Sequence, residues 1–421
     1  MEPKLFRSSC LLFVLFVAPA LANGQNYSIR DLGQGFYPEA VNDLAQVAGW
    51  RTLGFSDRAF LVSWGANIEI PLIGGYRNYA YGINNRGEVV GISDSGVVNP
   101  QAFIYRRGIA TMLPLGTIYS KAVDINDRGE IVGQLFAPHP GTTGMFRAFL
   151  YSDGVTTVIP YLGEGQNDAT GINASGAVVG YSSLGGVSSP HAFLYQNGLL
   201  TDLGALGTGQ ASRANEINDA GQIVGWSHIT FQSVTPYHAF LYECGAMQDL
   251  GSIGADRSEA LSVNNLGQVV GRAEGFSIGT HAFVYENGHV VDLNSIIPDL
   301  RGWELLSATD INNHGQIVGL GRHDGNLHGY LLLPERSVAE LIEHLIEVTG
   351  TFAEDEPSVS GLIAKLSTAR DSFARDSSKA GCNQIRAYVH LLDSRNRPIL
   401  APHIDYFVET AREITQRAAC P

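Results

Sequence analysis

The sequence predicts a mainly β fold, a seven-bladed β-propeller closed by its N-terminal strand and followed by a small α-helical bundle. The first observation behind this prediction is a motif of an apolar residue, an Asn and, seven residues after the Asn, a Gly. Its copies recur every 42 to 48 residues, at residues 42–49, 84–91, 126–133, 173–180, 218–225, 264–271 and 312–319. A period of this size, filled with short strand-like segments, is typical of propeller blades.

One repeat illustrates the four strands expected in each blade. Residues 214–218 and 222–226 are predicted strands joined by a tight turn, in which Asn and Asp bond the backbone and Gly takes a positive φ. A long loop leads to a third strand at residues 238–242, and a second turn leads to a fourth at residues 246–250. The third strand carries the second recurring observation, an Ala-Phe pair. The pair occurs at residues 59–60, 102–103, 148–149, 192–193, 239–240 and 282–283, with Gly329-Tyr330 as a degenerate last copy.

The two ends of the repeat region complement each other. Residues 27–33 have the pattern of a fourth strand without the preceding three, and residues 330–334 have that of a third strand without a fourth. Pairing between these segments joins the first and last blades and removes exposed sheet edges. The sequence therefore predicts seven blades of four strands in a closed ring.

The repeats resemble the HAF family of extracellular repeats, named for the tripeptide His-Ala-Phe that begins here at His191, His238 and His281. The resemblance covers roughly residues 27–334, and the first copy departs from it because Ala45 replaces the turn Gly. The family implies secretion and a repeated β-structure, but no established activity.

The N-terminus is predicted to be a secretory signal peptide of residues 1–22, cleaved after Ala22. Lys4 and Arg7 precede an apolar segment at residues 11–17, and small residues flank the cleavage site. The apolar segment is too short to span a membrane, and no other apolar run approaches that length. We therefore expect an extracellular or periplasmic protein without an integral membrane segment in the mature chain.

The net charge of −14 argues against nucleic acid and anionic membranes as partners, because both require clustered Lys and Arg. Charged residues make up only 16% of the chain, so polar uncharged side chains are expected to cover much of the surface. The expected partner is a glycan or an extracellular protein, and the mature chain is expected to be a monomer.

The mature chain is predicted to contain two domains, a propeller at residues 23–334 and an α-helical domain at residues 335–421. Apolar residues at helical spacing predict four helices in the second domain. They span residues 338–350, 359–373, 379–392 and 403–419. Cys382 and Cys420 lie together in this domain, and we predict that they form a disulfide in an oxidising compartment.

The C-terminal segment resembles the FIMAH-type α-helical domain of secreted bacterial proteins. The matching sequence segments are Leu-Ile-Ala-Lys-Leu at residues 362–366 and Ala-Gly-Cys-Asn-Gln at residues 380–384. The resemblance implies an accessory role, such as attachment, and no chemistry.

The sequence contains no zinc-binding HExxH or paired CxxC, no phosphate-binding loop, no GxSxG and no EF-hand calcium loop. Asp124, Glu216 and Asp310 share one position, two residues before the repeat Asn. On an inner strand they would ring the central channel, where they could hold a cation. We favour the alternative, in which they solvate the channel or bond the neighbouring backbone.

The repeat histidines are not predicted to bind a metal. His191, His238, His281 and His328 begin the same strand in successive blades, so a blade width separates them and one ion cannot contact them all. We expect a repeated packing or hydrogen-bonding role, with no catalytic residue, metal or cofactor assigned.

The long loops of all blades are predicted to leave from one face, opposite the tight turns, and loops held by a rigid scaffold often carry function. Aromatic rings on this face can stack on sugars or anchor a protein, and Arg can bind carboxylates. The ligand-binding candidates are Tyr76, Arg77, Tyr79, Tyr119, Trp226, Arg257 and Trp303.

The leading hypothesis is a secreted, non-catalytic propeller scaffold that binds a glycan or a protein through this face. One alternative is a secreted polysaccharide hydrolase or lyase that uses acids near the axis, with Asp124 and Glu216 as the pair to test. Another is a purely structural extracellular protein. The fold alone does not decide among them.

Overall fold

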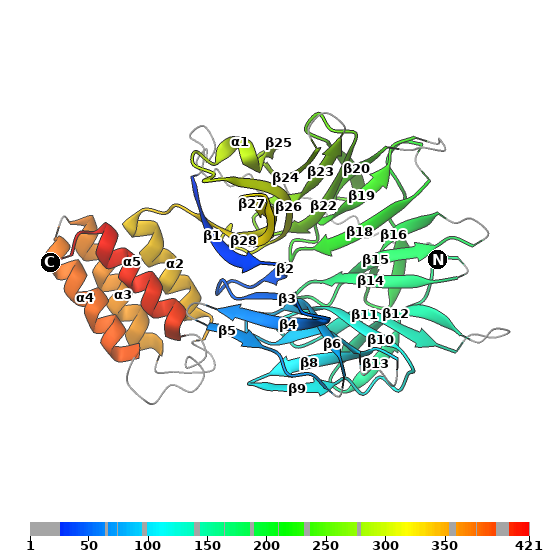
Figure 1. Ribbon diagram of the computed structural model, residues 1–421, viewed down its shortest axis with the longest axis horizontal. Helices are drawn as coiled ribbons and strands as arrows, with labels where there is room; N and C mark the ends of the chain where they lie inside the picture. The colour runs from blue at the N-terminus through cyan, green and yellow to red at the C-terminus, as the bar shows by residue number, and fades with distance from the viewer. Residues whose placement is uncertain are drawn as a thin grey trace, which may run out of the picture.

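The computed structural model describes residues 26–63, 66–73, 75–94, 99–138, 144–163, 165–185, 189–208, 210–230, 236–275, 279–352, 359–375, 377–392 and 404–420. Within these residues, seven four-stranded antiparallel sheets surround a central axis, and a bundle of helices lies beside them (Figure 1). The predicted fold class, a seven-bladed β-propeller followed by helices, is confirmed. The predicted signal peptide, residues 1–22, lies outside the described residues.

The first six blades take their strands in chain order. Blade 1 consists of β2 (Phe36–Val41), β3 (Val47–Leu53), β4 (Ser56–Ser63) and β5 (Ala66–Glu69). Blade 2 consists of β6 (Arg77–Ile83), β7 (Val89–Asp94), β8 (Gln101–Arg106) and β9 (Ile109–Met112). Blade 3 consists of β10 (Ser120–Ile125), β11 (Ile131–Ala137), β12 (Met145–Ser152) and β13 (Val155–Val158).

Blades 4 to 6 repeat this order. Blade 4 consists of β14 (Asn167–Ile172), β15 (Val178–Ser183), β16 (Pro190–Gln196) and β17 (Leu199–Asp202). Blade 5 consists of β18 (Ser212–Ile217), β19 (Ile223–His228), β20 (Tyr237–Glu243) and β21 (Ala246–Gly251). Blade 6 consists of β22 (Arg257–Val263), β23 (Val269–Gly275), β24 (Gly279–Glu286) and β25 (His289–Asp292), and a short helix, α1 (Leu293–Ile296), follows it.

Blade 7 joins the two ends of the repeat region. Its strands are β26 (Trp303–Ile311), β27 (Ile317–His323), β28 (Asn326–Pro334) and β1 (Tyr27–Gln34). β1 pairs antiparallel with β28, with Tyr27 opposite Pro334 and Gln34 opposite His328. This is the ring closure predicted from the incomplete strand patterns at the two ends of the repeat region. It leaves no blade with an unpaired third strand.

The two repeated sequence motifs form one packing unit. The motif Gly on the second strand stands directly opposite the Phe of the Ala-Phe pair on the third, as in Gly91 opposite Phe103. A Cβ atom on Gly91 would lie 1.9 Å from the carbonyl oxygen of Tyr79 on the inner strand and 2.9 Å from the Phe103 ring. Phe103 is buried in the core. Glycine therefore allows the inner strand and the buried ring to approach the second strand closely.

The repeat asparagines connect all seven blades in a closed ring. Each side-chain NH2 group donates to the backbone carbonyl of the repeat Asn in the next blade, at 2.8 to 3.1 Å. The last link runs from Asn312 back to Asn42. Each turn also contains a residue with left-handed φ, which is Gly in six copies and Ala45, at φ 53°, in the first. The asparagines are therefore turn-formers, as predicted, and also links between blades.

Four helices follow the propeller. They are α2 (Val338–Gly350), α3 (Val359–Ala374), α4 (Ser378–Leu392) and α5 (Ile404–Arg417). Ser337 begins α2 with a capping box, because its side chain accepts from the Glu340 N–H while the Glu340 carboxylate accepts from the Ser337 N–H. No helix in the described part of the chain is long and apolar enough to cross a membrane.

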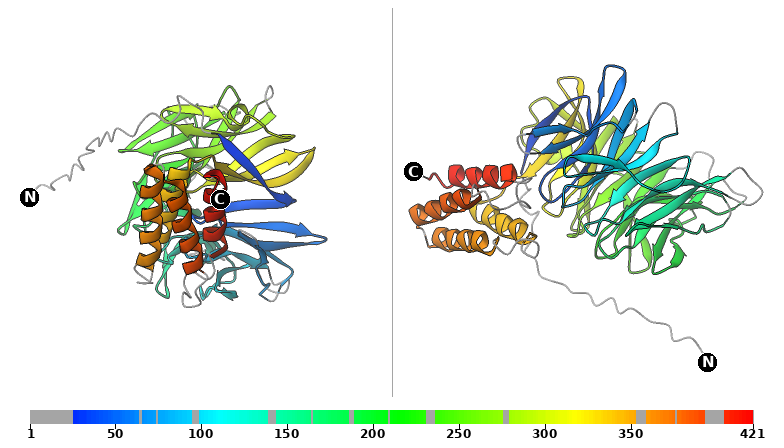
Figure 2. Two further views of the ribbon diagram at one scale, coloured as in Figure 1. Left: turned by 90° about the vertical axis from the view of Figure 1, so that its left-hand side faces the viewer. Right: turned by 90° about the horizontal axis from the view of Figure 1, so that it is seen from below.

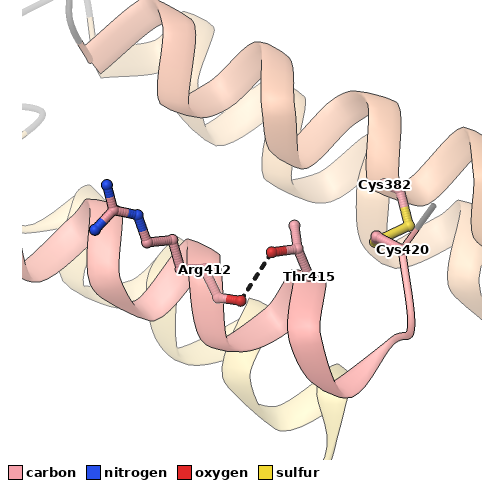
Figure 3. Close-up of a disulfide and its surroundings, with 4 residues drawn as sticks. All are labelled: Cys382, Arg412, Thr415 and Cys420. Carbon is pink, nitrogen blue, oxygen red and sulfur yellow. Dashed lines mark hydrogen bonds between the residues drawn. A yellow bond between two sulfur atoms is a disulfide. The ribbon is translucent and has the colours of Figure 1, made fainter.

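A disulfide between Cys382 and Cys420 ties the C-terminal end of the chain to α4, as predicted (Figure 3). The two Cα atoms lie 5.7 Å apart. Cys382 is buried in the bundle, next to the apolar face of α4. The bridge thus fixes the segment after α5 against its neighbouring helix.

We expect Cys420→Ser to destabilise the helical bundle by about 3–4 kcal/mol, because the bridge closes a long loop and restricts the unfolded chain. The sequence separation of the two cysteines is 38 residues. Urea unfolding followed by far-UV circular dichroism measures the change, since the helices dominate that signal. An unchanged unfolding midpoint would show that the bundle does not depend on the bridge.

The bundle packs on the face of the propeller that carries the tight Asn turns, here called the turn face (Figure 2). His314, in the turn of blade 7, places its ring 4.1 Å from that of His344 on α2. Arg336 donates to the His314 carbonyl at 2.6 Å. Leu44, in the turn of blade 1, belongs to the same apolar cluster as Leu341 of α2. The opposite face, from which the long loops leave, is called the loop face.

Candidate functional site

A cavity of about 190 Å³ lies on the propeller axis at the turn face. Its wall consists of the repeat asparagines, the residues directly before and after them and, in four blades, the residue two positions before the Asn. The three acids predicted to ring the channel belong to this wall: Asp124 of β10, Glu216 of β18 and Asp310 of β26. The structure therefore brings the three predicted acids together around one cavity.

These acids hold the backbone of neighbouring blades. Asp124 accepts the N–H of Ile172 from blade 4 at 2.9 Å. Asp310 accepts the N–H of Val41 from blade 1 at 2.7 Å and the hydroxyl of Ser262 from blade 6 at 2.5 Å. Such contacts agree with the favoured expectation that the acids bond the surrounding backbone.

Glycine at the equivalent position of other blades makes room for the acids. A Cβ atom on Gly82 would lie 2.9 Å from the Cα of Asp124, and one on Gly171 would lie 2.6 Å from Oε1 of Glu216. The equivalent residue of the following blade can then place its backbone or its carboxylate against the glycine. Acidic and small residues are therefore complementary parts of the same ring.

Burial and mutual repulsion raise the pKa of the axial acids. Burial raises the pKa of Asp124 to about 6, with a further contribution from the charge of Asp310. The pKa of Glu216 is raised well above its ordinary value, first by burial and then by the charge of Asp124. The ring therefore keeps protons at a pH where exposed carboxyl groups have lost theirs.

We predict that Glu216→Gln stabilises the protein at pH 8 and has little effect at pH 4.5. Because the folded-state pKa of Glu216 is raised above its unfolded value, the folded chain binds more protons than the unfolded chain from about pH 4 upward until that raised pKa is passed, and stability falls as pH rises through this window. Gln removes the charge and keeps an acceptor for the Ile217 N–H, which Oε1 binds at 2.8 Å. Thermal unfolding at the two pH values checks this, with a Tm gain of about 2–4 °C expected at pH 8. A loss at both values would contradict it.

A second group of side chains, here called the inner-strand cluster, runs across five blades on the two innermost strands. Its members are Glu39, Trp50, Tyr79, Tyr81, Lys121, Asp168, Tyr181 and Arg213. Six of them stand three or five residues before a repeat Asn. The four at five residues lie toward the loop-face end of their strand, and they are Tyr79, Lys121, Asp168 and Arg213. Aromatic rings and charges of both signs therefore alternate along the cluster.

Contacts between neighbouring blades hold the cluster together. The Trp50 indole packs edge-to-face on Tyr79, with ring centroids 5.3 Å apart. Lys121 Nζ lies 4.1 Å from the centroid of the Tyr81 ring. The Trp50 Nε1–H also donates to Glu39 at 2.9 Å. Cation–π and edge-to-face contacts of this kind orient rings and charges together.

The other end of the cluster is centred on Asp168. The Tyr181 hydroxyl donates to its carboxylate at 3.3 Å, and the Arg213 guanidinium lies 4.3 Å from the Tyr181 ring centroid. Burial raises the pKa of Asp168, although Lys121 and Arg213 act in the opposite direction. Among the described residues, Asp168 Oδ1 and Arg213 Nε are buried atoms without a hydrogen-bond partner. Buried polar atoms are rarely left unpaired, so these two are candidates for contact with a ligand.

The predicted loop-face residues fall into different environments. Tyr79 is part of the inner-strand cluster, and its hydroxyl donates to Asp57 at 2.6 Å. Tyr76 is 70% exposed just before β6, and Arg77 forms a long ion pair with Asp57 at 3.8 Å. Tyr119 packs edge-to-face on Phe146 next to β10.

The remaining candidates divide between blades 5, 6 and 7. Trp226 of β19 packs against Tyr237, and the Arg257 guanidinium lies 5.5 Å from the centroid of the same ring. Trp303 is only 7% exposed, because it belongs to the core of blade 7 and stacks on His323. Trp303 therefore packs the blade and is not available to stack on a ligand.

Glu39, Lys121 and Asp168 are absent from the candidates chosen from the sequence. Their common signal is a fixed spacing, since Lys121 and Asp168 precede their repeat Asn by five residues and Glu39 precedes its Asn by three. The inner strands carry a β-bulge close to this point, at Ala122/Asp124 in blade 3. That bulge changes which side chains share a face, so alternation alone does not identify them.

The repeat histidines pair with acids on the adjacent outer strand, as their predicted hydrogen-bonding role requires. His191 contacts Asp202 and His238 contacts Asp249, each at 2.9 Å. The other two pairs are His281 with Asp292 at 2.6 Å and His328 with Asp31 at 3.0 Å. The four histidines do not meet at one point.

No protein-family model matches the chain, and no curated protein matches it. Solved structures similar to it include the β-propeller domain of the Trilobed protease from Pyrococcus furiosus, with 10% identity, a TM-score of 0.46 and coverage of 62% of this chain and 84% of that one. Another is an acylaminoacyl peptidase from Pyrococcus horikoshii, with 10% identity, a TM-score of 0.48 and coverage of 71% and 51%. A gluconolactonase from Xanthomonas campestris has 11% identity, a TM-score of 0.38 and coverage of 76% and 94%. These likenesses concern the fold and assign no activity.

Proposed function

We propose that the protein is a secreted, monomeric, non-catalytic propeller scaffold that binds a glycan through its loop face, at the inner-strand cluster. The observation that carries the proposal is the pair of unsatisfied buried atoms, Asp168 Oδ1 and Arg213 Nε, beside aromatic rings. Secretion and membership of the HAF family of extracellular repeats, with a FIMAH-type C-terminal domain, are parts of the same proposal.

Sugar chemistry fits this arrangement. A sugar hydroxyl both donates and accepts, so one hydroxyl can donate to Asp168 while a neighbouring one accepts from Arg213. The aromatic members of the cluster offer apolar faces on which sugar rings stack. Charges of both signs within the cluster favour a neutral glycan over a strongly anionic one.

The non-catalytic part of the proposal is supported by the contacts of the axial acids. Asp124 and Asp310 each bond the backbone of a neighbouring blade, and Glu216 bonds the N–H of the residue that follows it. Their cavity, at about 190 Å³, is also smaller than typical ligand pockets of about 300–1,000 Å³. A hydrolase or lyase using Asp124 and Glu216 is the alternative that the experiment must separate.

A glycan array probed with the mature chain, residues 23–421, tests the proposal, with mass spectrometry of any bound glycan after incubation. We expect binding without cleavage. Asp168→Asn should then weaken the affinity at least about tenfold, because it removes the charge from a buried hydrogen bond to the ligand. Its fold is checked by the melting temperature.

Phe55→Ala is the matched control, since Phe55 is fully exposed at the tip of the β3–β4 hairpin on the same face. Glycan binding that is lost in Phe55→Ala and unchanged in Asp168→Asn would show that the glycan binds at the exposed hairpin tip and not at the inner-strand cluster. Cleavage of the glycan that disappears in Glu216→Gln would overturn the proposal and support a hydrolase or lyase that uses the axial acids. No glycan binding would overturn it in favour of a protein partner.

A further inference from the structure

Among the described residues, blade 7 carries a polar cluster that is not found in the other blades. In blades 4, 5 and 6 the repeat His contacts one Asp of the outer strand, as in His238 with Asp249. In blade 7, His328 of β28 contacts Asp31 of β1, and a second histidine, His323 of β27, also reaches this carboxylate. Three strands therefore contribute three potential metal ligands.

The distances between the ligand atoms are short. His328 Nδ1 lies 3.0 Å from Asp31 Oδ1, and His323 Nδ1 lies 3.6 Å from Asp31 Oδ2. One ligand atom of each of the three residues lies within 4.8 Å of the others, and this is the one such group of His, Cys, Asp or Glu in the described part of the chain. The two histidine rings have centroids 5.5 Å apart.

Strand register explains why the three side chains meet. His323 pairs with Asn326 and His328 pairs with Gly321, so the two histidines are diagonal neighbours on one face of the β27–β28 hairpin. Diagonal positions on paired strands are close enough for long side chains to touch. Asp31 reaches the same face from β1, which exists in this blade only because the chain closes on itself.

We propose that Asp31, His323 and His328 bind one divalent transition-metal ion of the Zn²⁺ type. Zn²⁺ takes His and carboxylate ligands at about 2.0–2.1 Å in a tetrahedron, which places ligand atoms about 3.3 Å apart. The distances from the two histidines to Asp31, 3.0 Å to Oδ1 and 3.6 Å to Oδ2, lie on either side of that value. The ion replaces the direct hydrogen bond between His328 and Asp31, and only small shifts of the side chains are needed.

Surrounding groups hold the ligands in place. The Trp303 ring stacks on His323 with centroids 4.6 Å apart and planes inclined by 6°. The Asp324 carboxylate lies 4.0 Å from His323 Nε2, too far for a direct hydrogen bond to the ring. The Gly33 N–H donates to Asp31 at 2.7 Å.

The site is open to solvent on one side. The side chains of Asp31, His323 and His328 are 39%, 28% and 15% exposed. A water molecule can therefore complete four-coordination around an ion held by three protein ligands. Because β1 is the closing strand, metal binding also adds a link across the junction between the chain ends of the propeller.

Isothermal titration of the chelator-treated mature chain with Zn²⁺ tests the proposal. We expect one ion per chain and a Tm that rises with Zn²⁺ concentration, because the folded chain binds the ion. His323→Phe keeps a ring to stack on Trp303 and removes both nitrogen donors, and it should weaken binding at least about 100-fold. Asp31→Asn, which keeps an acceptor for the Gly33 N–H, should also weaken binding.

The matched control is His238→Ala, which removes the blade 5 counterpart of His328. The described residues of blade 5 contain no second histidine that completes a triad. This variant should bind Zn²⁺ as the unaltered protein does. Absence of Zn²⁺ binding, or binding that His323→Phe leaves unchanged, would overturn the proposal. Loss of binding in His238→Ala but not in His323→Phe would likewise contradict it.

Discussion

Asn264→Ala should destabilise the propeller by about 3–5 kcal/mol, because it leaves several buried backbone groups without partners. The Asn264 side chain donates to the carbonyl of Asn312 in blade 7 and to Gln268, and it accepts from the N–H groups of Leu266 and Gln268. It is only 3% exposed, so water does not replace these bonds readily. A substitution in one blade also opens the ring that joins all seven.

Thermal and urea unfolding measure this effect, with a Tm decrease of roughly 2–4 °C for each kcal/mol lost. Leu266→Ala is the control from the same turn, because Leu266 is 71% exposed and its backbone N–H is unchanged by the substitution. Surface changes of this kind usually stay within about 0.5 kcal/mol. Equal effects of the two variants would show that the asparagine ring contributes little.

Gly91→Ala should prevent blade 2 from packing and yield little folded protein. A Cβ atom at this position would lie 1.9 Å from the Tyr79 carbonyl oxygen and 2.9 Å from the Phe103 ring. The first obstacle is backbone and the second is a fully buried ring, so neither can move aside without disturbing the blade. We expect a loss above about 4 kcal/mol, in the range that only severe core disruption reaches.

Soluble yield and the unfolding midpoint check this result. Gly361→Ala is the control, because the same substitution in α3 meets nothing within 4 Å. It should stabilise the helix slightly, by up to about 1 kcal/mol, since Ala has the higher helix propensity. A stable, well-folded Gly91→Ala variant would contradict the packing role assigned to the motif Gly.

The local elements of this protein could be predicted because each is specified by neighbouring residues. The turn of each blade depends on an Asn and a residue with left-handed φ, and the α2 start depends on Ser337 and Glu340. Closure of the ring was also predictable, because the incomplete strand patterns at the two ends complement each other, as the pairing of β1 with β28 shows.

The candidate site was less predictable, because it depends on contacts between blades. Trp303 has the sequence context of a loop residue, but the tertiary structure buries it in blade 7. Lys121 and Asp168 are 47 residues apart in the chain and influence each other's pKa only because adjacent inner strands bring them together. A residue pattern within one repeat does not contain this information.

The sequence by itself determined the number of blades, the four strands of each, the closing strand and the four helices, because these features follow from repeated short-range patterns. Tertiary structure alone decided which side chains converge. It brought Asp31, His323 and His328 to one face of blade 7 and placed Asp124, Glu216 and Asp310 around one cavity. The physical reason is that strand register, β-bulges and ring closure set the distances between side chains that lie far apart in the chain.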